Sequence, residues 1–227
     1  MNSGHESDHD RKRRLRRDLL EVRRSLPPDV VAASGVALAR RTLELAELAE
    51  FTGLRVAESG EGAPGAAAPS GPAVARTVAA YVSFGNEPPT LPLLDRLRAA
   101  GVRVLLPVLL PDNDLDWAAY EGPERLVPAG WGLLEPDGGR LGPEAVTEAD
   151  VVLLPGLAVD GRGLRLGRGG GSYDRVLERL ERAGSAASLV VLLYDAEVLE
   201  AVPAEPHDRI VHAAVTPSGV HRFLRPA

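Results

Sequence analysis

Between residues 161 and 174, glycines and arginines alternate in a pattern that can bind a polyphosphate. The segment reads G-R-G-L-R-L-G-R-G-G-G-S-Y-D. Glycine lets backbone N–H groups approach an anion closely, and arginine presents forked donors that suit phosphate oxygens. Arg162, Arg165 and Arg168 are all placed to serve in this way. The alternative is a loop that only turns a corner while its arginines remain solvated.

The residues on either side of this segment predict a strand before it and a helix after it. Val151 to Leu154 is a short apolar run typical of a buried parallel strand. Beyond the glycines, Val176, Leu177 and Leu180 recur at helical spacing, and Gly184 is expected to end the helix. The start of that helix would add free N–H groups and the positive end of its dipole. A strand, a glycine loop and a helix together predict an anion site.

Two familiar nucleotide-binding motifs do not match this segment. A P-loop ends in G-K followed by Ser or Thr, and no such ending is present. A dinucleotide fingerprint would require glycine where Ser172 stands, with its glycines directly after the strand. Asp195, at the end of the next apolar run, has the position of a ribose ligand, but we do not count it as one.

A basic helix is predicted near the start of the chain, over residues 11 to 26. Lys12 and Arg16 lie one turn apart, so they project together and could grip a polyphosphate. From the sequence alone, a solvated basic face or an arm for nucleic acid is the favoured alternative. Apolar residues at helical spacing predict one buried stripe on this helix. They are Leu15, Leu19, Val22 and Leu26.

Composition limits the classes of protein that remain. With 227 residues, 44% of them hydrophobic, the chain can form one α/β domain with a substantial core. The absence of cysteine excludes disulfides, thiolate zinc sites and cysteine nucleophiles. A net charge of −6 weighs against a nucleic-acid partner. No signal peptide or membrane span is recognisable, so we expect a cytoplasmic protein without a membrane partner. We also expect a monomer.

Strands and helices are expected to alternate along most of the chain. We expect a disordered tail at 1–10, a single α/β domain at 11–227 and a flexible Gly/Pro/Ala/Ser insertion at about 57–73. A helix is expected at 28–51 and another ending near Gly101, while the W-G-L-L-E-P segment resembles a loop. This alternation predicts a mostly parallel sheet flanked by helices on both faces. The expected strands are Val78–Phe84, Val102–Val108, Leu115–Tyr120 (as an edge strand), Val151–Leu154, Leu189–Tyr194 and Ile210–Thr216.

Ligands of such sheets bind beyond the carboxyl ends of the strands. Glu87, in G-N-E-P-P-T, follows one expected strand, and Asp195 follows another. We therefore expect both to lie near the glycine loop, along one rim of the sheet.

Several motifs, in order, give the chain a resemblance to the 5-formyltetrahydrofolate cyclo-ligase family. They are K-R-R-L-R, E-P-P-T, W-G-L-L-E-P, L-P-G-L-A-V-D, R-L-G-R-G-G-G-S-Y-D-R and P-H-D, and the resemblance spans nearly the whole chain from Lys12 to Thr216. The resemblance implies a three-layer domain like those of NagB, RpiA and CoA transferases. It also implies an ATP- and Mg²⁺-dependent conversion of 5-formyltetrahydrofolate, with or without a polyglutamate tail, to 5,10-methenyltetrahydrofolate with release of ADP and phosphate.

The resemblance also assigns roles to individual residues. The implied metal ligands are Asp174 and Asp208, and the implied catalytic residues are Arg168 and Gly170. The implied folate contacts are Val82, Glu87, Arg168, Gly169, Gly170, Gly171 and Ser172. The implied ATP contacts are Lys12, Arg13, Arg14, Leu15, Arg16, Arg165, Leu166, Gly167, Arg168, Gly169, Gly170, Gly171, Ser172 and Tyr173.

The chain departs from the family pattern at two of the quoted motifs. Ser172 replaces the first aromatic of G-Y-Y-D, and Val159 replaces an aromatic in L-A-F-D. Neither change removes a charge or a phosphate donor. His207, in P-H-D, is interpreted as a local packing residue rather than a base. The remaining alternatives are another anion-handling enzyme, such as a sugar-phosphate isomerase or CoA transferase, and a nucleic-acid-binding protein that uses the arm from Arg11 to Arg17.

Overall fold

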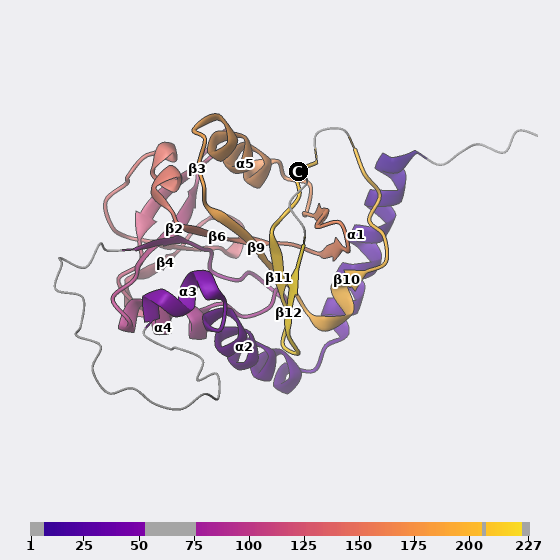
Figure 1. Ribbon diagram of the computed structural model, residues 1–227, viewed down its shortest axis with the longest axis horizontal. Helices are drawn as coiled ribbons and strands as arrows, with labels where there is room; N and C mark the ends of the chain where they lie inside the picture. The colour runs from indigo at the N-terminus through magenta and orange to yellow at the C-terminus, as the bar shows by residue number, and fades with distance from the viewer. Residues whose placement is uncertain (1–6, 53–75, 206–207, 224–227) are drawn as a thin grey trace, which may run out of the picture.

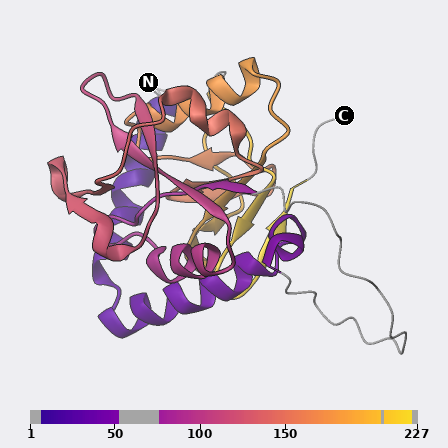
Figure 2. The same cartoon turned by 90° about the vertical axis from the view of Figure 1, so that its left-hand side faces the viewer.

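The computed structural model describes residues 7–52, 76–205 and 208–223. The insertion expected at 57–73, His207 and the first six residues of the expected tail lie outside these ranges. The described chain forms a central sheet with helices on both faces (Figures 1 and 2). The expected three-layer α/β fold is therefore confirmed. No helix of the described residues is long and apolar enough to cross a membrane.

The central sheet has seven strands in the order β12-β11-β9-β6-β1-β2-β3. The five inner strands run parallel, and β3 and β12 close the two edges in antiparallel pairings. These strands are β1 (Thr77–Ala79), β2 (Arg103–Leu109), β3 (Leu115–Ala119), β6 (Val151–Pro155), β9 (Ser188–Leu192), β11 (Ala213–Val215) and β12 (Val220–Arg222).

Alternation along the central strand β6 explains why both faces of the sheet are covered. Val151 and Leu153 pack on one face, and Val152 and Leu154 pack on the other. All four are at most 1% exposed, as a strand between two helical layers requires. The first face is covered by α2 (Pro28–Leu43), α3 (Ala46–Thr52) and α4 (Leu91–Ala99), and the second by α5 (Ser172–Arg182) and the 3-10 helix Pro143–Glu148. Figure 1 shows α5 above the sheet and α2 to α4 below it.

A smaller unit holds the N-terminal helix α1 (Asp8–Ser25) against the domain. Three short strands, β7 (Ala158–Asp160), β8 (Arg165–Leu166) and β10 (Val198–Leu199), form a sheet in the order β10-β7-β8. Leu15, Leu19 and Leu20 of α1 pack against its apolar side. Val22, expected on the same buried stripe, is instead 54% exposed. The stripe therefore turns towards Leu20 rather than continuing through Val22.

Several expected boundaries are corrected by the structure. Residues 8–10 are helical, because the Ser7 side chain caps α1 by accepting from the Asp10 N–H. The helix expected at 28–51 is broken near Glu44 into α2 and α3. The strand expected at Val78–Phe84 is shorter in the structure, because β1 ends at Ala79. The chain beyond β1 leads into the loop that carries Glu87.

The W-G-L-L-E-P segment is not a simple loop. It forms a 3-10 turn, Gly130–Gly132, followed by β5 (Leu134–Pro136), which pairs with β4 (Leu126–Pro128). Trp131 stands at the tip with φ of 63° and is 86% exposed. A bulky residue with positive φ is uncommon and stores backbone strain. The other tryptophan, Trp117 of β3, is fully buried.

Candidate functional site

A cavity of about 290 Å³ opens at the carboxyl ends of three neighbouring parallel strands. Tyr81 and Val82 follow β1, Pro107 and Leu109 end β2, and Pro155 ends β6. This is the edge at which open α/β sheets bind ligands. Its lining is mostly apolar on the sheet side and glycine-rich on the other. The remaining lining residues are Phe84, Glu87, Leu115, Leu133, Leu134, Glu135, Gly156, Arg165 and the run from Gly167 to Asp174.

Glu87 places a buried carboxylate in this cavity. The loop that carries it is fixed by Thr90, whose hydroxyl donates to the Tyr81 carbonyl and accepts from the Ser83 N–H. One carboxylate oxygen of Glu87 accepts from the Phe84 N–H at 2.9 Å, and the other lies 3.1 Å from Arg168 Nε. Burial raises the pKa of Glu87, and the Phe84 hydrogen bond and the Arg168 charge offset this only in part.

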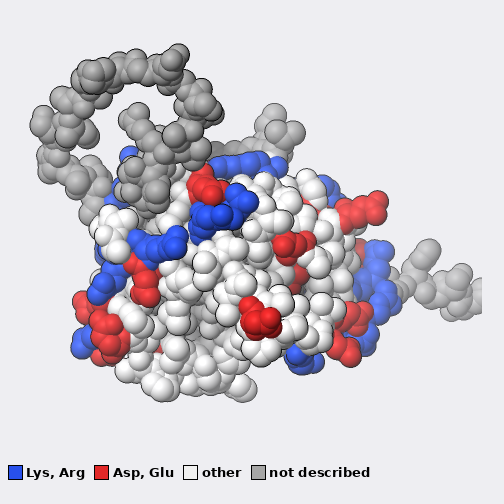
Figure 3. Space-filling model, turned by 90° about the horizontal axis from the view of Figure 1, so that it is seen from below, with Lys and Arg blue, Asp and Glu red and all other residues white. Residues whose placement is uncertain are grey.

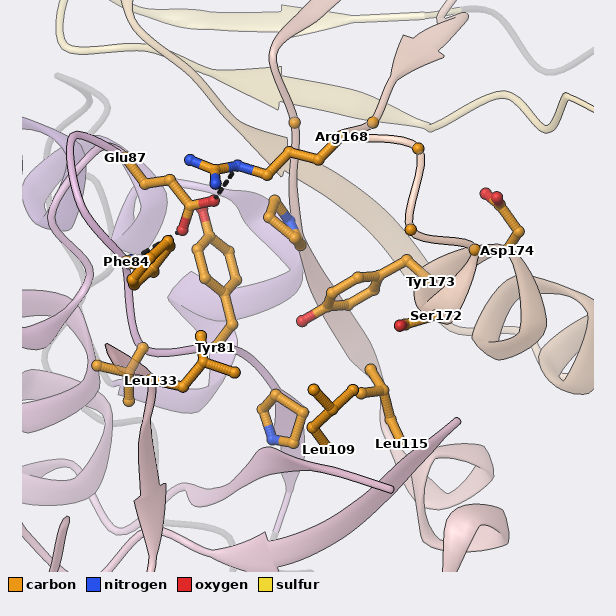
Figure 4. A pocket seen from close by; sticks show the side chains of 18 of the residues that line it. Tyr81, Phe84, Glu87, Leu109, Leu115, Leu133, Arg168, Ser172, Tyr173 and Asp174 are labelled. Atoms are coloured by element: carbon orange, nitrogen blue, oxygen red, sulfur yellow. Dashed lines mark hydrogen bonds and ion pairs between the residues drawn. The ribbon is translucent and has the colours of Figure 1, made fainter. Parts of the chain in front are cut away.

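Arg168 reaches from the glycine loop across the mouth of the cavity to Glu87, as Figure 4 shows. Its guanidinium lies 5.5 Å from the centre of the Phe84 ring. The side chain is 40% exposed, so the guanidinium remains accessible to a ligand. Arg168 therefore links the glycine loop to the buried carboxylate of Glu87.

The second half of the glycine loop (Gly167 to Gly171) leaves open space where side chains would otherwise stand. A Cβ placed on Gly170 or Gly171 would meet no atom within 4 Å. Gly171 has φ of 80° and precedes α5, whose N-terminus receives no hydrogen bond from a capping side chain of the described residues. The first N–H groups of α5 are thus available to an anion, and the positive end of its dipole points to the same place.

Arg165 lies beneath the loop rather than in it. The side chain is 6% exposed, and its Nη1 donates to the Pro155 carbonyl at 2.8 Å. Its Nη2 lies 3.5 Å from the Asp174 carboxylate. Burial lowers the pKa of Arg165, opposed by the charges of Asp174 and Asp208. It supports the loop from below and contributes positive charge without being open to solvent.

The predicted convergence of α1 on the glycine loop holds for Arg16. Its Nε donates to the Gly167 carbonyl at 2.9 Å, and its guanidinium carbon would lie 3.3 Å from a Cβ on Gly169. Lys12, one turn away, is only 3% exposed. Its Nζ lies 2.7 Å from Glu205 and 2.6 Å from Asp208, so it is held between two carboxylates.

A buried ion pair fixes α1 in this position. Arg23 is 1% exposed, and its Nε and Nη2 donate to both carboxylate oxygens of Glu197 at 2.6 and 2.8 Å. Nη2 also donates to the Gly156 carbonyl, next to the end of β6. Removing one member of such a pair leaves an uncompensated buried charge. The ion pair therefore holds the helix that brings Arg16 to the loop.

Arg162 and its glycines are not part of the anion site. Gly161 and Gly163 form the turn between β7 and β8, and Arg162 folds back onto Asp160 at 2.6 Å. The expectation that Arg162 serves a phosphate beside Arg165 and Arg168 is therefore wrong. The reason is that Asp160 sits two residues before it, where a short turn brings the two charges together.

The two expected metal ligands lie near the loop but are differently engaged. Asp174 starts α5 with a side chain 59% exposed, and in Figure 4 its carboxylate points outward, away from Tyr81. Both oxygens of Asp208 accept from Lys12. The charges of both carboxylates act on the buried guanidinium of Arg165. Among the described residues, no group of three or more His, Cys, Asp or Glu forms a ready-made metal cage.

The other residues expected in the site lie in three different surroundings. Val82 and Ser172 line the cavity. Leu15 and Leu166 pack in the core of the small sheet, and their side chains do not face the loop. Arg13 and Arg14 are exposed on α1, and Arg13 pairs with Asp10. Ser172 begins α5, so its departure from the family pattern shortens a side chain at the mouth of the cavity.

Two further expectations concern Asp195 and Val159. Asp195 follows β9 at the carboxyl end of the sheet, but it accepts from the Ser218 hydroxyl and N–H and does not line the cavity, in agreement with our not counting it as a ligand. Val159 is fully buried in the core on the α5 side, where it lines no part of the cavity.

Sequence reasoning missed much of the apolar wall. Pro107, Leu109 and Leu115 belong to β2 and β3, where nothing distinguishes them from core residues. Tyr81 was also missed, although a tyrosine at the end of an otherwise aliphatic strand is a signal. Leu133, Leu134 and Glu135 stand in the quoted W-G-L-L-E-P motif, which was not assigned to the site.

The comparisons with known proteins agree with this geometry. Residues 69–217 match the model of the 5-formyltetrahydrofolate cyclo-ligase family. A Mycolicibacterium smegmatis protein named 5-formyltetrahydrofolate cyclo-ligase is 46% identical over 147 residues, which cover 63% of this chain and 74% of that protein. An Escherichia coli K12 protein of the same name is 36% identical over 149 residues, covering 65% and 81%.

Solved structures resemble the fold over nearly the whole chain. The Aquifex aeolicus 5,10-methenyltetrahydrofolate synthetase superposes with a TM-score of 0.71 at 24% identity, covering 95% of this chain and 94% of that one. The Mycoplasma pneumoniae synthetase gives 0.63 at 17% identity, covering 91% and 98%. The family match begins after α1, so it contains Glu87, the glycine loop and Asp208 but not Lys12 or Arg16. From the match of residues 69–217 and the identity to these relatives, the chain belongs to the 5-formyltetrahydrofolate cyclo-ligase family.

Proposed function

We propose that the cavity and the glycine loop together carry out ATP-dependent ring closure of 5-formyltetrahydrofolate to 5,10-methenyltetrahydrofolate, by phosphorylation of the formyl oxygen. Membership of the family gives the cyclo-ligase reaction and implies the use of ATP. The assignment of the folate to the cavity and of ATP to the loop rests on the position of Arg168. This residue joins a buried carboxylate in an apolar cavity to a loop with an open helix N-terminus.

The chemistry requires a poor leaving group to be activated. The formyl oxygen attacks the γ-phosphorus of ATP, the bond to the bridging oxygen breaks, and ADP leaves. Nitrogen-10 of the folate then attacks the resulting iminium-like carbon and loses its proton. The C–O bond breaks, and phosphate departs with the former formyl oxygen. Such steps call mainly for positioning and neutralisation of charge, and no nucleophilic side chain is needed.

Residues of the site fall on two sides of the reacting atoms. Glu87, Val82 and the apolar wall hold the folate, and the loop N–H groups with Arg16 hold the polyphosphate. Arg168 lies between them and stabilises negative charge as the phosphoryl group moves. A polyphosphate also offers Lys12 a new partner in place of Glu205 and Asp208.

Magnesium fits the carboxylates beside the loop. Mg²⁺ commonly takes one or two carboxylates and completes its octahedron with waters and substrate phosphates. Asp174 is exposed beside the loop and fits this role directly. Asp208 fits it once Lys12 turns to the polyphosphate. When bound, the ion would neutralise phosphate charge. We expect Asp174→Asn to raise the magnesium concentration needed for half-maximal rate, and Asp208→Asn to do so less; unchanged values in both would contradict the assignment.

The remaining alternatives receive no support from particular contacts. On α1, arginines pair with nearby acids, as Arg11 does with Asp8 and Arg17 with Asp18. Figure 3 shows blue and red side chains intermingled along the edge next to the grey tail. A solvated face whose arginines pair with neighbouring acids fits these contacts better than an arm for nucleic acid. Monomeric state and lack of a nucleic-acid partner stay predictions.

The test is a coupled measurement of both products. The protein is incubated with ATP, magnesium and 5-formyltetrahydrofolate while methenyl absorbance and phosphate release are followed. We expect both signals to rise with equal stoichiometry and to vanish when either substrate is left out. Tetrahydrofolate without a formyl group is the matched control and should release no phosphate. Phosphate release that does not depend on the formyl group would contradict the proposal.

A further inference from the structure

Two buried tyrosine hydroxyls in the cavity have no hydrogen-bond partner. Tyr81 is 4% exposed, and neither its hydroxyl nor that of Tyr173 is bonded to any described group. Both residues line the cavity. A buried hydroxyl without a partner is costly to a folded protein. Such groups in a native structure call for an explanation, and a missing ligand is one.

Some of the buried side-chain atoms that lack a hydrogen-bond partner belong to residues of this cavity. Seven buried side-chain N or O atoms of the described residues lack a partner, and three of them belong to cavity-lining residues. These three are the two hydroxyls and Arg165 Nε. By contrast, the hydroxyl of Tyr120, which lies outside the cavity, donates to Asp95 at 2.6 Å. Four of the seven atoms lie elsewhere, but the two tyrosine hydroxyls among the seven both belong to the cavity, so the lack of a partner does not extend to every tyrosine.

Both hydroxyls face the place where a folate ring would lie. In Figure 4 the Tyr81 ring rises from the cavity wall towards Glu87, and the Tyr173 hydroxyl is directed inward, away from the outward-pointing Asp174. Around them the wall is apolar, formed by Pro107, Leu109 and other residues of the strands. A flat ring held against that wall would turn its polar edge towards the two hydroxyls.

The charge state of the two phenols makes them donors. Burial raises the pKa of both, and the charge of Glu87 adds to the effect. Each therefore keeps its proton at neutral pH and can donate it to a neutral oxygen. A reduced pterin presents ring N–H groups, which suit the Glu87 carboxylate, next to a ring carbonyl and the formyl oxygen, which suit phenol donors.

We propose that Tyr81 and Tyr173 are positioning residues for the folate, whose hydroxyls donate hydrogen bonds to oxygen atoms along the polar edge of the bicyclic ring. This rests on the proposed function. It adds Tyr81 to the site and moves Tyr173 from the nucleotide, where the resemblance placed it, to the folate. The hydroxyls are unpartnered in the free enzyme and become satisfied when the substrate binds.

The test uses Tyr81→Phe and Tyr173→Phe, which remove only the hydroxyls and keep the packing. Binding of 5-formyltetrahydrofolate is measured by calorimetry without ATP, so that no turnover occurs, and thermal melting is recorded in parallel. We expect each variant to weaken folate binding about five- to tenfold, the effect of one lost hydrogen bond. The KM for ATP should be unchanged, and the melting temperature should be unchanged or higher, because an unsatisfied hydroxyl has been removed.

Tyr120→Phe is the matched control and should behave in the opposite way. Its hydroxyl has a partner, so melting temperature should fall while folate affinity stays at the wild-type value. Wild-type folate binding with unchanged affinity in both cavity variants overturns the inference and leaves the proposed function intact. A raised KM for ATP in Tyr173→Phe at unchanged folate affinity returns that residue to the nucleotide. Wild-type protein that does not bind the folate at all overturns both proposals.

Discussion

Two arginine–carboxylate pairs, only six residues apart at their arginines, behave in opposite ways. In the closed turn, Asp160 is fully buried and accepts from the Arg162 side chain and from the N–H groups of Arg162, Leu164 and Val202. In the open loop, Arg168 pairs with Glu87. Burial alone would raise the pKa of Asp160, but these hydrogen bonds outweigh it and lower it, whereas the pKa of Glu87 stays raised.

The difference shows how to separate a structural glycine–arginine turn from a binding one. Composition is the same in both, since each has glycines flanking an arginine. What differs is whether the polar groups already have partners. The Asp160 turn satisfies its carboxylate internally, so its charge stabilises the fold. The loop around Arg168 leaves the first N–H groups of α5 without a capping side chain and leaves the Glu87 carboxyl with a raised pKa. Both features are typical of a ligand-binding site.

The largest expected effect on stability comes from adding a methyl group to the closed turn, and the same change in the open loop is the comparison. Gly163 has φ of 81°, and its Cβ would lie 2.6 Å from the Val211 carbonyl, which cannot move freely. We expect Gly163→Ala to lower the free energy of unfolding by about 3 kcal/mol or more, measured by urea denaturation. Gly170→Ala, with open space around it, should change stability by less than about 0.5 kcal/mol and raise the KM for ATP. Equal destabilisation by both would erase the distinction.

Removing each arginine should separate turnover from stability. We expect Arg168→Ala to lower kcat/KM for the folate by about a hundredfold, because a charge that acts on the moving phosphoryl group is lost, with stability within about 1 kcal/mol of wild type. Arg162→Ala should keep turnover near wild type and lower the urea midpoint of unfolding, because the buried Asp160 carboxylate loses its charged partner. Steady-state kinetics and urea denaturation on the same preparations measure both. A loss of turnover in Arg162→Ala would place the closed turn in the site after all.

The Asp160 carboxylate should stabilise the fold only while it is ionised. Because its folded-state pKa is lowered, the contribution is present above the ordinary aspartate pKa and is lost as pH falls through the folded value. We expect Asp160→Asn to cost about 2 kcal/mol at neutral pH and the difference from wild type to shrink below about pH 4. Asp18→Asn, which alters an exposed pair with Arg17, is the control and should cost less than about 0.5 kcal/mol.

Substitution of Glu87 should change stability least, and its pH dependence should have the opposite sign to that of Asp160. The folded-state pKa of Glu87 is raised, so ionisation is disfavoured in the fold, and stability declines as pH rises through that pKa. We expect the melting temperature of Glu87→Gln, relative to wild type, to increase as pH rises from about 4 to about 8, by about 2–4 °C at most. Folate affinity should fall in the same variant. A relative melting temperature that decreases over this range would show that the Glu87 charge stabilises the free protein.

The sequence predicted those parts of the site that depend on local pattern. The β6 strand, the glycine loop and the start of α5 are continuous in the chain, so their glycine content and helical spacing were sufficient. The mostly parallel sheet between two helical layers also followed from the alternation of strands and helices, although the order of the strands was not predicted. From its helical spacing alone Arg16 was interpreted as part of a solvated basic face, and only tertiary packing brings its side chain to Gly167.

What the sequence could not give depends on contacts between distant segments. Lys12 and Asp208 are both charged residues that a phosphate or a metal could use, and nothing local indicates that they pair with each other. The opposite fates of Arg162 and Arg168 likewise depend on which carboxylate each can reach in space. Pro107 and Leu109 of β2 form a wall only after the strands align, and as sequence they are ordinary core residues.

The placement of the two tryptophans gives the protein a built-in pair of optical reporters. Trp117 is in the core, where its indole should emit at shorter wavelength and resist a soluble quencher such as acrylamide. Trp131, at the tip of the hairpin whose Leu133 and Leu134 line the cavity, should emit at longer wavelength and be quenched readily. The quenchable component therefore reports on the hairpin and the resistant one on the core. Events at the substrate pocket and global unfolding can then be distinguished in one unlabelled sample.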